Sequence, residues 1–240
     1  MTSDLDPRLI YFIHIQKTSG TSIRRYLMQS FGKKRVLWHS TSKVKTEKNL
    51  ANFVDTPDLD IQNYRAVGGH LGFAKIPPAI LKRGPIIISM IRDPLTRALS
   101  QYQHVTTRSE HPLYPKMAGL SLYEALQVQQ FRRLVDGRQL DYLCGKNDAS
   151  LVRPRLQNYG YIIGKQEKSE QFFDTLSQRL GLKRPPDDPR VNVSTGDYKT
   201  RIQSQEQFDS AFQYLKNLNE QESIFYNSFE DVLVKMPEAS

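Results

Sequence analysis

The sequence has very little cysteine and no long hydrophobic run, and both features limit what the chain can be. Its 240 residues include one cysteine, Cys144, so no disulfide can form within the chain. A lone cysteine fits a reducing compartment or a protein indifferent to redox state. No Cys/His cluster has the spacing of zinc ligands, and we expect no metal site. No apolar segment is long enough to cross a bilayer and residues 1–9 lack a signal-peptide core, which predicts a soluble, cytoplasmic protein without membrane insertion.

Acidic residues are also in the minority. The chain has 34 Lys and Arg against 25 Asp and Glu, a formal net charge of +9, with 38% apolar residues. This composition is typical of a globular protein with an anionic partner. Charge alone does not distinguish nucleic acid, an anionic nucleotide, an acidic polysaccharide and a membrane surface.

The strongest local signal lies in residues 11–22, which read YFIHIQKTSGTS. An apolar, strand-like run stops at Lys17 and is followed by small or hydroxylated residues. A turn of this kind after a buried strand can place backbone N–H groups, a helix N-terminus and a lysine charge around one anion. The Walker A loop places its glycines before the lysine, whereas here Lys17 precedes Gly20. The sequence therefore predicts a relative of the P-loop enzymes that uses a different donor.

A second signal lies in residues 85–102, which read PIIISMIRDPLTRALSQY. A buried strand leads into Arg92, after which Asp93 suits a helix N-cap and Pro94 the first helical position. Helical spacing then lets Arg97 and Ser100 lean toward the same anion as Arg92.

Alternating strands and helices predict an α/β fold with a P-loop-like, doubly wound parallel sheet flanked by helices. We expect one domain over residues 1–240, with a donor-binding α/β core in 1–110 and a mostly helical portion in 111–240 that completes the site. The expected strands are 9–15, 35–38, 64–69, 86–91 and 161–164, and the expected helices are 21–31, a helix from 94, 121–135, 167–180, 205–217 and 219–234. Ligands of such sheets bind at the carboxyl ends of the strands, where Lys17, His70 and Arg92 all fall.

The two motifs resemble those of the sulfotransferases that use 3′-phosphoadenosine 5′-phosphosulfate. In that family a K-T-x-G-T-[ST] loop holds the 5′-phosphosulfate, and an R-D-P-x-x-R-x-x-S-x-Y segment holds the 3′-phosphate. The resemblance implies that these loop residues contact the phosphosulfate: Lys17, Thr18, Ser19, Gly20, Thr21 and Ser22. The alternative role of the residues after Lys17 is to cap the helix that follows. It implies that Arg92 and Ser100 hold the 3′-phosphate, with Arg97 either a third ligand or a salt-bridged helix residue. Lys199 and Arg201 stand where the family often keeps a basic flap over the donor.

Two further segments resemble the glycan O-sulfotransferases that act on heparan and related polysaccharides. Residues 14–18, HIQKT, are similar to the 6-O type, and residues 68–74, GGHLGFA, to the 2-O type, in which a histidine is the catalytic base. By position this residue is His70, although Gly68 stands where the 2-O enzymes carry a second histidine. The resemblance implies a hydroxyl acceptor on a saccharide. Because the animal enzymes carry an N-terminal membrane anchor, we expect either a bacterial enzyme or a trimmed catalytic domain.

The remaining alternatives concern the base, the acceptor groove and the reaction class. If His70 is not the base, His14, His104 or a carboxylate could serve. Residues 142–145 stand where related enzymes contact adenine, and a basic cluster could either line an acidic-acceptor groove or form a solvated face: Arg132, Arg133, Arg138, Lys146, Arg153 and Arg155. A kinase-like phosphotransferase would need glycines before the lysine, and a nucleic-acid-binding protein has only the net charge in its favour. We therefore expect sulfuryl transfer without a metal, because the transferred group carries less charge than a phosphoryl group, and no nucleic-acid partner.

Overall fold

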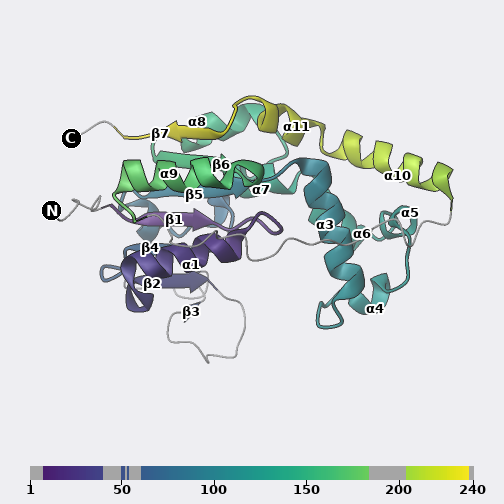
Figure 1. The fold of residues 1–240 in the computed structure, drawn as a ribbon, viewed down its shortest axis with the longest axis horizontal. Helices are drawn as coiled ribbons and strands as arrows, with labels where there is room; N and C mark the ends of the chain where they lie inside the picture. The colour runs from purple at the N-terminus through teal and green to yellow at the C-terminus, as the bar shows by residue number, and fades with distance from the viewer. Residues whose placement is uncertain (1–7, 40–49, 52, 54–60, 184–203, 238–240) are drawn as a thin grey trace.

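The computed structural model describes residues 8–39, 50, 51, 53, 61–183 and 204–237 (Figure 1). These residues form a seven-stranded sheet in the order β3-β2-β4-β1-β5-β6-β7. Its strands are β1 Ile10–Ile13, β2 Val36–His39, β3 Leu50–Ala51, β4 Ala66–Gly69, β5 Ile86–Ile91, β6 Gly160–Lys165 and β7 Val232–Lys235. The strand pairs are parallel except for β6 with β7, which is antiparallel. The predicted α/β fold with a mainly parallel sheet is confirmed.

Helices cover both faces of this sheet and extend beyond one end of it (Figure 1). The α-helices are α1 Gly20–Phe31, α2 Pro78–Leu81, α3 Pro94–Thr107, α4 Tyr114–Met117, α5 Leu122–Ala125, α6 Gln129–Val135, α7 Arg138–Cys144, α8 Val152–Leu156, α9 Ser169–Leu180, α10 Gln205–Leu218 and α11 Glu220–Asn227. The short 3₁₀ helices are η1 Lys33–Arg35, η2 Phe73–Lys75, η3 Ala149–Leu151 and η4 Gln166–Lys168.

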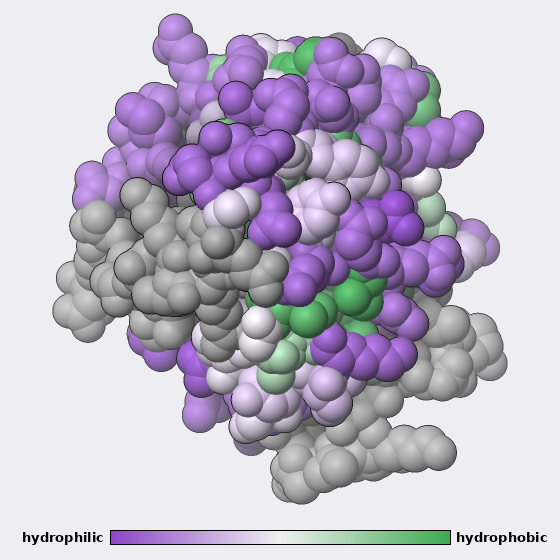
Figure 2. All heavy atoms as spheres, turned by 90° about the vertical axis from the view of Figure 1, so that its right-hand side faces the viewer, coloured by the Kyte–Doolittle hydropathy of each residue, from purple (hydrophilic) through white to green (hydrophobic). Residues whose placement is uncertain are grey.

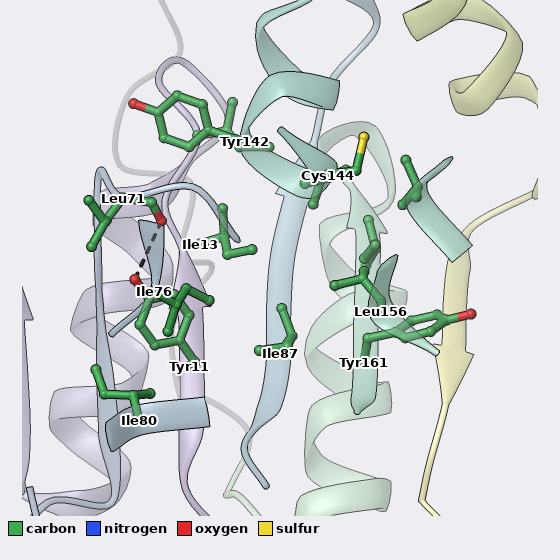
Figure 3. Packing of buried hydrophobic residues seen from close by; sticks show 14 of the residues in the cluster. Tyr11, Ile13, Leu71, Ile76, Ile80, Ile87, Tyr142, Cys144, Leu156 and Tyr161 are labelled. Carbon is green, nitrogen blue, oxygen red and sulfur yellow. Dashed lines mark hydrogen bonds between the residues drawn. The ribbon is translucent and has the colours of Figure 1, made fainter. Parts of the chain in front are cut away.

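The central strands are fully buried because their side chains enter a core on either face. Phe12 of β1 and Ile88 of β5 face α1 and α9, where Ile23 and Phe172 lie in the same cluster. Tyr11 and Ile87 point the other way, toward α2, α7, α8 and α11 (Figure 3). The Tyr11 hydroxyl donates to the carbonyl oxygen of Leu71, which satisfies a polar group within this core (Figure 3). A strand that is covered on both faces has apolar side chains at nearly every position, which is why the sequence predicts β5 correctly.

A third hydrophobic cluster lies off the sheet, between α3, α4, α5, α6 and α10. Tyr102 and Phe131 meet edge to face in it, with ring centroids 6.2 Å apart. This cluster holds α3 as it runs away from the carboxyl end of β5 (Figure 1). The long helix that begins at Pro94 is therefore fixed at both ends, by the sheet and by this cluster.

One predicted element ends earlier than expected. The expected helix 219–234 is α11 only as far as Asn227, and the chain then forms β7. Leu233 is buried and pairs with Ile163 of β6, so the Val-Leu-Val segment completes the sheet edge. Helical spacing predicted continuity, but β-branched residues next to an available strand favour sheet pairing.

Within the described ranges no helix has the length and apolar character needed to span a membrane.

Candidate active site

A pocket of about 600 Å³ opens where the carboxyl ends of the central strands meet α1 and α3. The loop after β1 and the start of α1 form one wall, and Arg92, Ser100, Gln101, His104, Arg108 and His111 form another. The rest of the lining is His14, His70, Gln166, Ser169 and Phe173. None of the lining residues, as far as the structure describes them, is acidic. The pocket is suited to an anionic ligand.

The loop after β1 has the backbone shape that presents N–H groups to an anion. Lys17 has φ 69° and Ser19 φ 61°, both in the left-handed region that side chains other than glycine rarely occupy. Ser19 is the N-cap of α1, yet its side chain makes no capping hydrogen bond. Strained residues of this kind persist where the surrounding structure fixes them, commonly at ligand sites. A left-handed turn followed by a helix N-terminus is the backbone arrangement that commonly binds anions in proteins.

Gly20 allows this loop to lie against the ring of His14. A Cβ atom at Gly20 would lie 1.8 Å from Cδ2 and Nε2 of His14, which no side chain can tolerate. The glycine is thus needed for close approach within the loop. The position of Gly20 after Lys17 is therefore explained by packing against His14, the residue that follows β1.

Lys17 and Arg92 face the same pocket from different strands. Lys17 follows β1, Arg92 follows β5, and the two strands are neighbours in the sheet. Burial lowers the pKa of Lys17, and the charges of Arg92 and Arg108 lower it further. This repulsion between cations is relieved when an anion binds between them.

A buried hydrogen-bond network fixes the main chain of Arg92. The side-chain amide of Gln139 accepts from the Arg92 N–H at 2.8 Å and donates to the Arg92 carbonyl at 2.9 Å. Glu222 holds this amide in turn, because its Oε2 accepts from Gln139 Nε2 at 2.9 Å and its Oε1 accepts from the Gln139 main-chain N–H. Burial raises the pKa of Glu222, and the nearby Arg97 charge opposes this shift. Residues of α7 and α11 therefore position a side chain at the end of β5.

Arg97 belongs to this network and does not line the pocket. Its side chain is fully buried, and it donates to the carbonyl oxygens of Leu134 and Val135 at 3.1 Å each. Its Nε lies 4.0 Å from Glu222 Oε2. Of the two roles predicted for Arg97, the structure has the salt-bridged helix residue.

His70 lies at the carboxyl end of β4 with its ring open to the pocket. Its Nδ1 is 2.8 Å from the carbonyl oxygen of His14, and because a carbonyl only accepts, this nitrogen carries the proton. Nε2 of the neutral ring is then free to accept a proton. The ring stacks on that of His14, with centroids 3.9 Å apart. Partial burial lowers the pKa of His70, helped by the charges of Arg138 and His39 and opposed by the hydrogen bond to His14.

Gly68, two residues before His70, cannot be replaced by a histidine in this fold. A Cβ atom there would lie 2.6 Å from the carbonyl oxygen of Phe12 on the neighbouring strand. The structure thus has no room for the second histidine of the 2-O type.

The structure brings most of the predicted residues to the pocket and leaves a few outside it. Those that line it are Lys17, Ser19, Gly20, Thr21, Ser22, His70, Arg92 and Ser100. Thr18 is buried and donates to the carbonyl of Ile15 at 2.9 Å, so its side chain braces the loop. Lys199 and Arg201 lie outside the described residues. Tyr142 and Cys144 do not line the pocket. They pack in the core on the sheet face that Tyr11 and Ile87 point toward, which is not the face covered by α1 and α9.

Sequence reasoning missed several lining residues. His104 was considered only as an alternative base, whereas Arg108 and His111 were not considered at all. Their spacing was a usable signal, since positions 100, 104 and 108 recur every four residues along α3. Gln166, Ser169 and Phe173 come from the β6–α9 junction, and no local pattern marks them.

Among the described residues there is no group of three or more His, Cys, Asp or Glu side chains that could hold a metal ion. Metal independence stays a prediction.

Known proteins are similar to the chain in fold and in sequence profile. A mouse sulfotransferase, SULT7A1, crystallised with PAP, is 14% identical, with a TM-score of 0.51 over 93% of this chain and 89% of that one. A sulfotransferase from Alicyclobacillus acidocaldarius is 16% identical, with a TM-score of 0.47 over 91% of this chain and 96% of that one. No curated protein matches. The sequence profile of the sulfotransferase family matches residues 5–223, and the chain therefore belongs to the sulfotransferase family.

Proposed function

We propose that the protein transfers a sulfuryl group from 3′-phosphoadenosine 5′-phosphosulfate to a hydroxyl group, with His70 as the general base. The observation that carries the proposal is the meeting of Lys17, Arg92 and His70 in one pocket that has no acidic lining residue among those described. SULT7A1, which shares the fold, was crystallised with PAP, and this supports the same donor here.

The pocket has two places for the negative charges of this donor. The left-handed turn, the start of α1 and Lys17 suit the 5′-phosphosulfate, whereas Arg92 and Ser100 suit the 3′-phosphate. Arg92 offers a planar fork of N–H donors, and Ser100 a hydroxyl on the facing helix. Thr21 and Ser22 add hydroxyl groups at the start of α1.

Sulfuryl transfer forms a bond between the acceptor oxygen and sulfur as the bond between sulfur and the 5′-phosphate oxygen breaks. The leaving phosphate takes the electron pair of that bond, and Lys17 is placed to stabilise the charge that develops there. The acceptor hydroxyl must lose its proton, and Nε2 of His70 is the free acceptor that can take it. Because the pKa of His70 is lowered, the ring is neutral at neutral pH and ready to act as a base.

The acceptor is proposed to be the hydroxyl of a saccharide. The support is the similarity of residues 14–18 and 68–74 to glycan O-sulfotransferases. Because a Cβ atom at Gly68 has no space, the second histidine of the 2-O type has no counterpart two residues before His70.

Thermal unfolding with three nucleotides tests the donor class. 3′,5′-Adenosine bisphosphate should raise the melting temperature more than equal concentrations of ATP or 5′-AMP, since stabilisation depends on ligand concentration over the dissociation constant. Arg92→Ala should remove the preference for the bisphosphate over 5′-AMP, because only the 3′-phosphate distinguishes them. Equal protection by ATP and the bisphosphate would instead favour a phosphotransferase.

A further inference from the structure

The pocket contains basic groups beyond those that the donor needs. His104, Arg108 and His111 line it, and none of them belongs to the two motifs that bind the donor. His104 lies in the last turn of α3, Arg108 caps that helix, and His111 follows in the next turn. Hydrogen bonds hold this segment in place: the Arg108 N–H donates to the His104 carbonyl at 3.2 Å, and the His111 N–H donates to the Arg108 carbonyl at 3.0 Å.

The direction of α3 places these groups away from the 3′-phosphate. A helix rises ~1.5 Å per residue, so His104 lies about 6 Å along α3 from Ser100, and Arg108 about 12 Å. One phosphate bound by Ser100 and Arg92 cannot reach both. Burial, and then the charge of Lys17, lower the pKa of His104, and His104 and Lys17 line the same pocket. His104 therefore lies within electrostatic range of the corner to which we assign the 5′-phosphosulfate, from which the sulfuryl group leaves for the acceptor.

The chemistry of the segment suits an anion. His111 Nδ1 accepts from the Leu113 N–H at 3.1 Å, so the neutral ring carries its proton on Nε2. The rings of His104 and His111 meet edge to face with centroids 5.4 Å apart. Among the residues that the structure describes, Arg108 has one ionic partner, Glu110, with 4.0 Å between Nη1 and Oε1, and both side chains are mostly exposed, at 63% and 71%. So loose and solvated a pair is worth little and gives way readily to a ligand carboxylate.

We propose that Arg108, His104 and His111 form an acceptor subsite for an acidic group, so that the preferred acceptor is an anionic hydroxyl compound. The inference rests on the proposed function and deepens it. Arg108 binds the carboxylate or sulfate of the acceptor, and His111 donates to it from Nε2. The surface at the end of the molecule formed by α4, α5, α6 and α10 is predominantly hydrophilic, with small hydrophobic patches (Figure 2).

Two matched sugars test the subsite without requiring turnover. We would measure by calorimetry how 4-nitrophenyl β-D-glucuronide and 4-nitrophenyl β-D-glucoside bind the protein loaded with 3′,5′-adenosine bisphosphate. The glucuronide, which has a carboxylate in place of the C6 hydroxymethyl group, should bind about tenfold tighter, the equivalent of one good charge-assisted contact. Arg108→Gln should abolish this ratio, and His111→Phe should reduce it. Arg179→Gln, which removes an exposed arginine of α9 outside the pocket, should keep the wild-type ratio.

Three results would overturn the subsite. The wild type could bind both sugars equally, or Arg108→Gln could leave the ratio intact. The same variant could also weaken bisphosphate binding by the factor that it costs the glucuronide, which would assign Arg108 to the donor. Failure of the proposed function would look different, because the wild type would then show no preference for the bisphosphate over ATP before any sugar is added.

Discussion

The two cationic corners of the pocket are built in different ways. The Lys17 corner is made within a few residues, by left-handed backbone at Lys17 and Ser19 and by the close approach of Gly20 to His14. The Arg92 corner is held from a distance, by Gln139 of α7 and Glu222 of α11. Local backbone shape thus forms the first corner, whereas at the second a buried side-chain network fixes the main chain of Arg92. The Arg92 guanidinium itself lies near Glu167, with 4.0 Å between Nε and Oε1.

The difference predicts how each corner fails. A change in the Lys17 loop should affect the reaction more than the fold, since Lys17 is only partly buried and its strain is stored in the loop. A change in the network behind Arg92 should affect both, because its members are buried and depend on one another.

The largest expected effect comes from Lys17→Ala. Loss of one preorganised group at a developing negative charge typically costs about 10²–10³ in kcat. We expect a loss of that size in sulfuryl transfer with little change in the urea midpoint. Lys34→Ala, an exposed lysine of η1, serves as the charge-matched control and should leave both quantities near wild type. A Lys17→Ala enzyme with full kcat would remove the contrast between the corners.

Glu222→Gln should weaken the network that holds the main chain of Arg92 at the second corner. The substitution leaves Arg97 without its carboxylate and sets an amide against the N–H donors of Gln139. Removing one partner of a buried pair is costly, and we expect a loss of about 3 kcal/mol in the free energy of unfolding. Urea denaturation measures this loss, and calorimetry should show weaker binding of 3′,5′-adenosine bisphosphate. Glu220→Gln on the exposed start of α11 should change stability by less than about 0.5 kcal/mol.

The pH dependence of kcat/KM tests the role of His70, whose ring stacks on that of His14 beside the Lys17 loop. The base must be neutral, so kcat/KM is lost as the pH falls through the pKa of His70. Burial lowers that pKa, and the acid limb should therefore lie below the ordinary value of about 6.5. His70→Gln should abolish the limb and lower kcat by roughly 10², the lower end of what a general base contributes. An acid limb that survives this substitution would assign the base to another group, with His104 the first to test.

The smallest expected effect is that of a chelator. Lys17 and Arg92 already supply the positive charge at both corners, so EDTA should leave turnover unchanged. Assays with EDTA, and with EDTA followed by excess Mg²⁺, measure this. Loss of activity that Mg²⁺ restores would show that the two corners are not sufficient.

Much of the fold and part of the site could be predicted from the sequence, because they depend on patterns among residues that are close together along the chain. The continuous apolar run of β5, the Asp93 cap and Pro94 at the helix start each depend on neighbours within a few residues, and the structure has all three, with the Thr96 N–H bonded to Asp93 at 2.8 Å. The end of the expected helix 219–234 was wrong, because Leu233 pairs with a strand some seventy residues earlier.

The sequence by itself determined where the apolar strands lie along the chain, the turn after Lys17 and the position of Arg92 at the end of a strand. Each of these is set by the preferences of residues within a short segment. Only the tertiary structure decided that Arg97 turns inward to Glu222, that Gln139 fixes Arg92, and that His104, Arg108 and His111 join the pocket. These outcomes depend on which side chains meet across distant elements, and burial forces polar groups to find partners there. Composition and periodicity do not determine those contacts; they follow from the packing of α7 and α11 against the sheet and against the helices around α3.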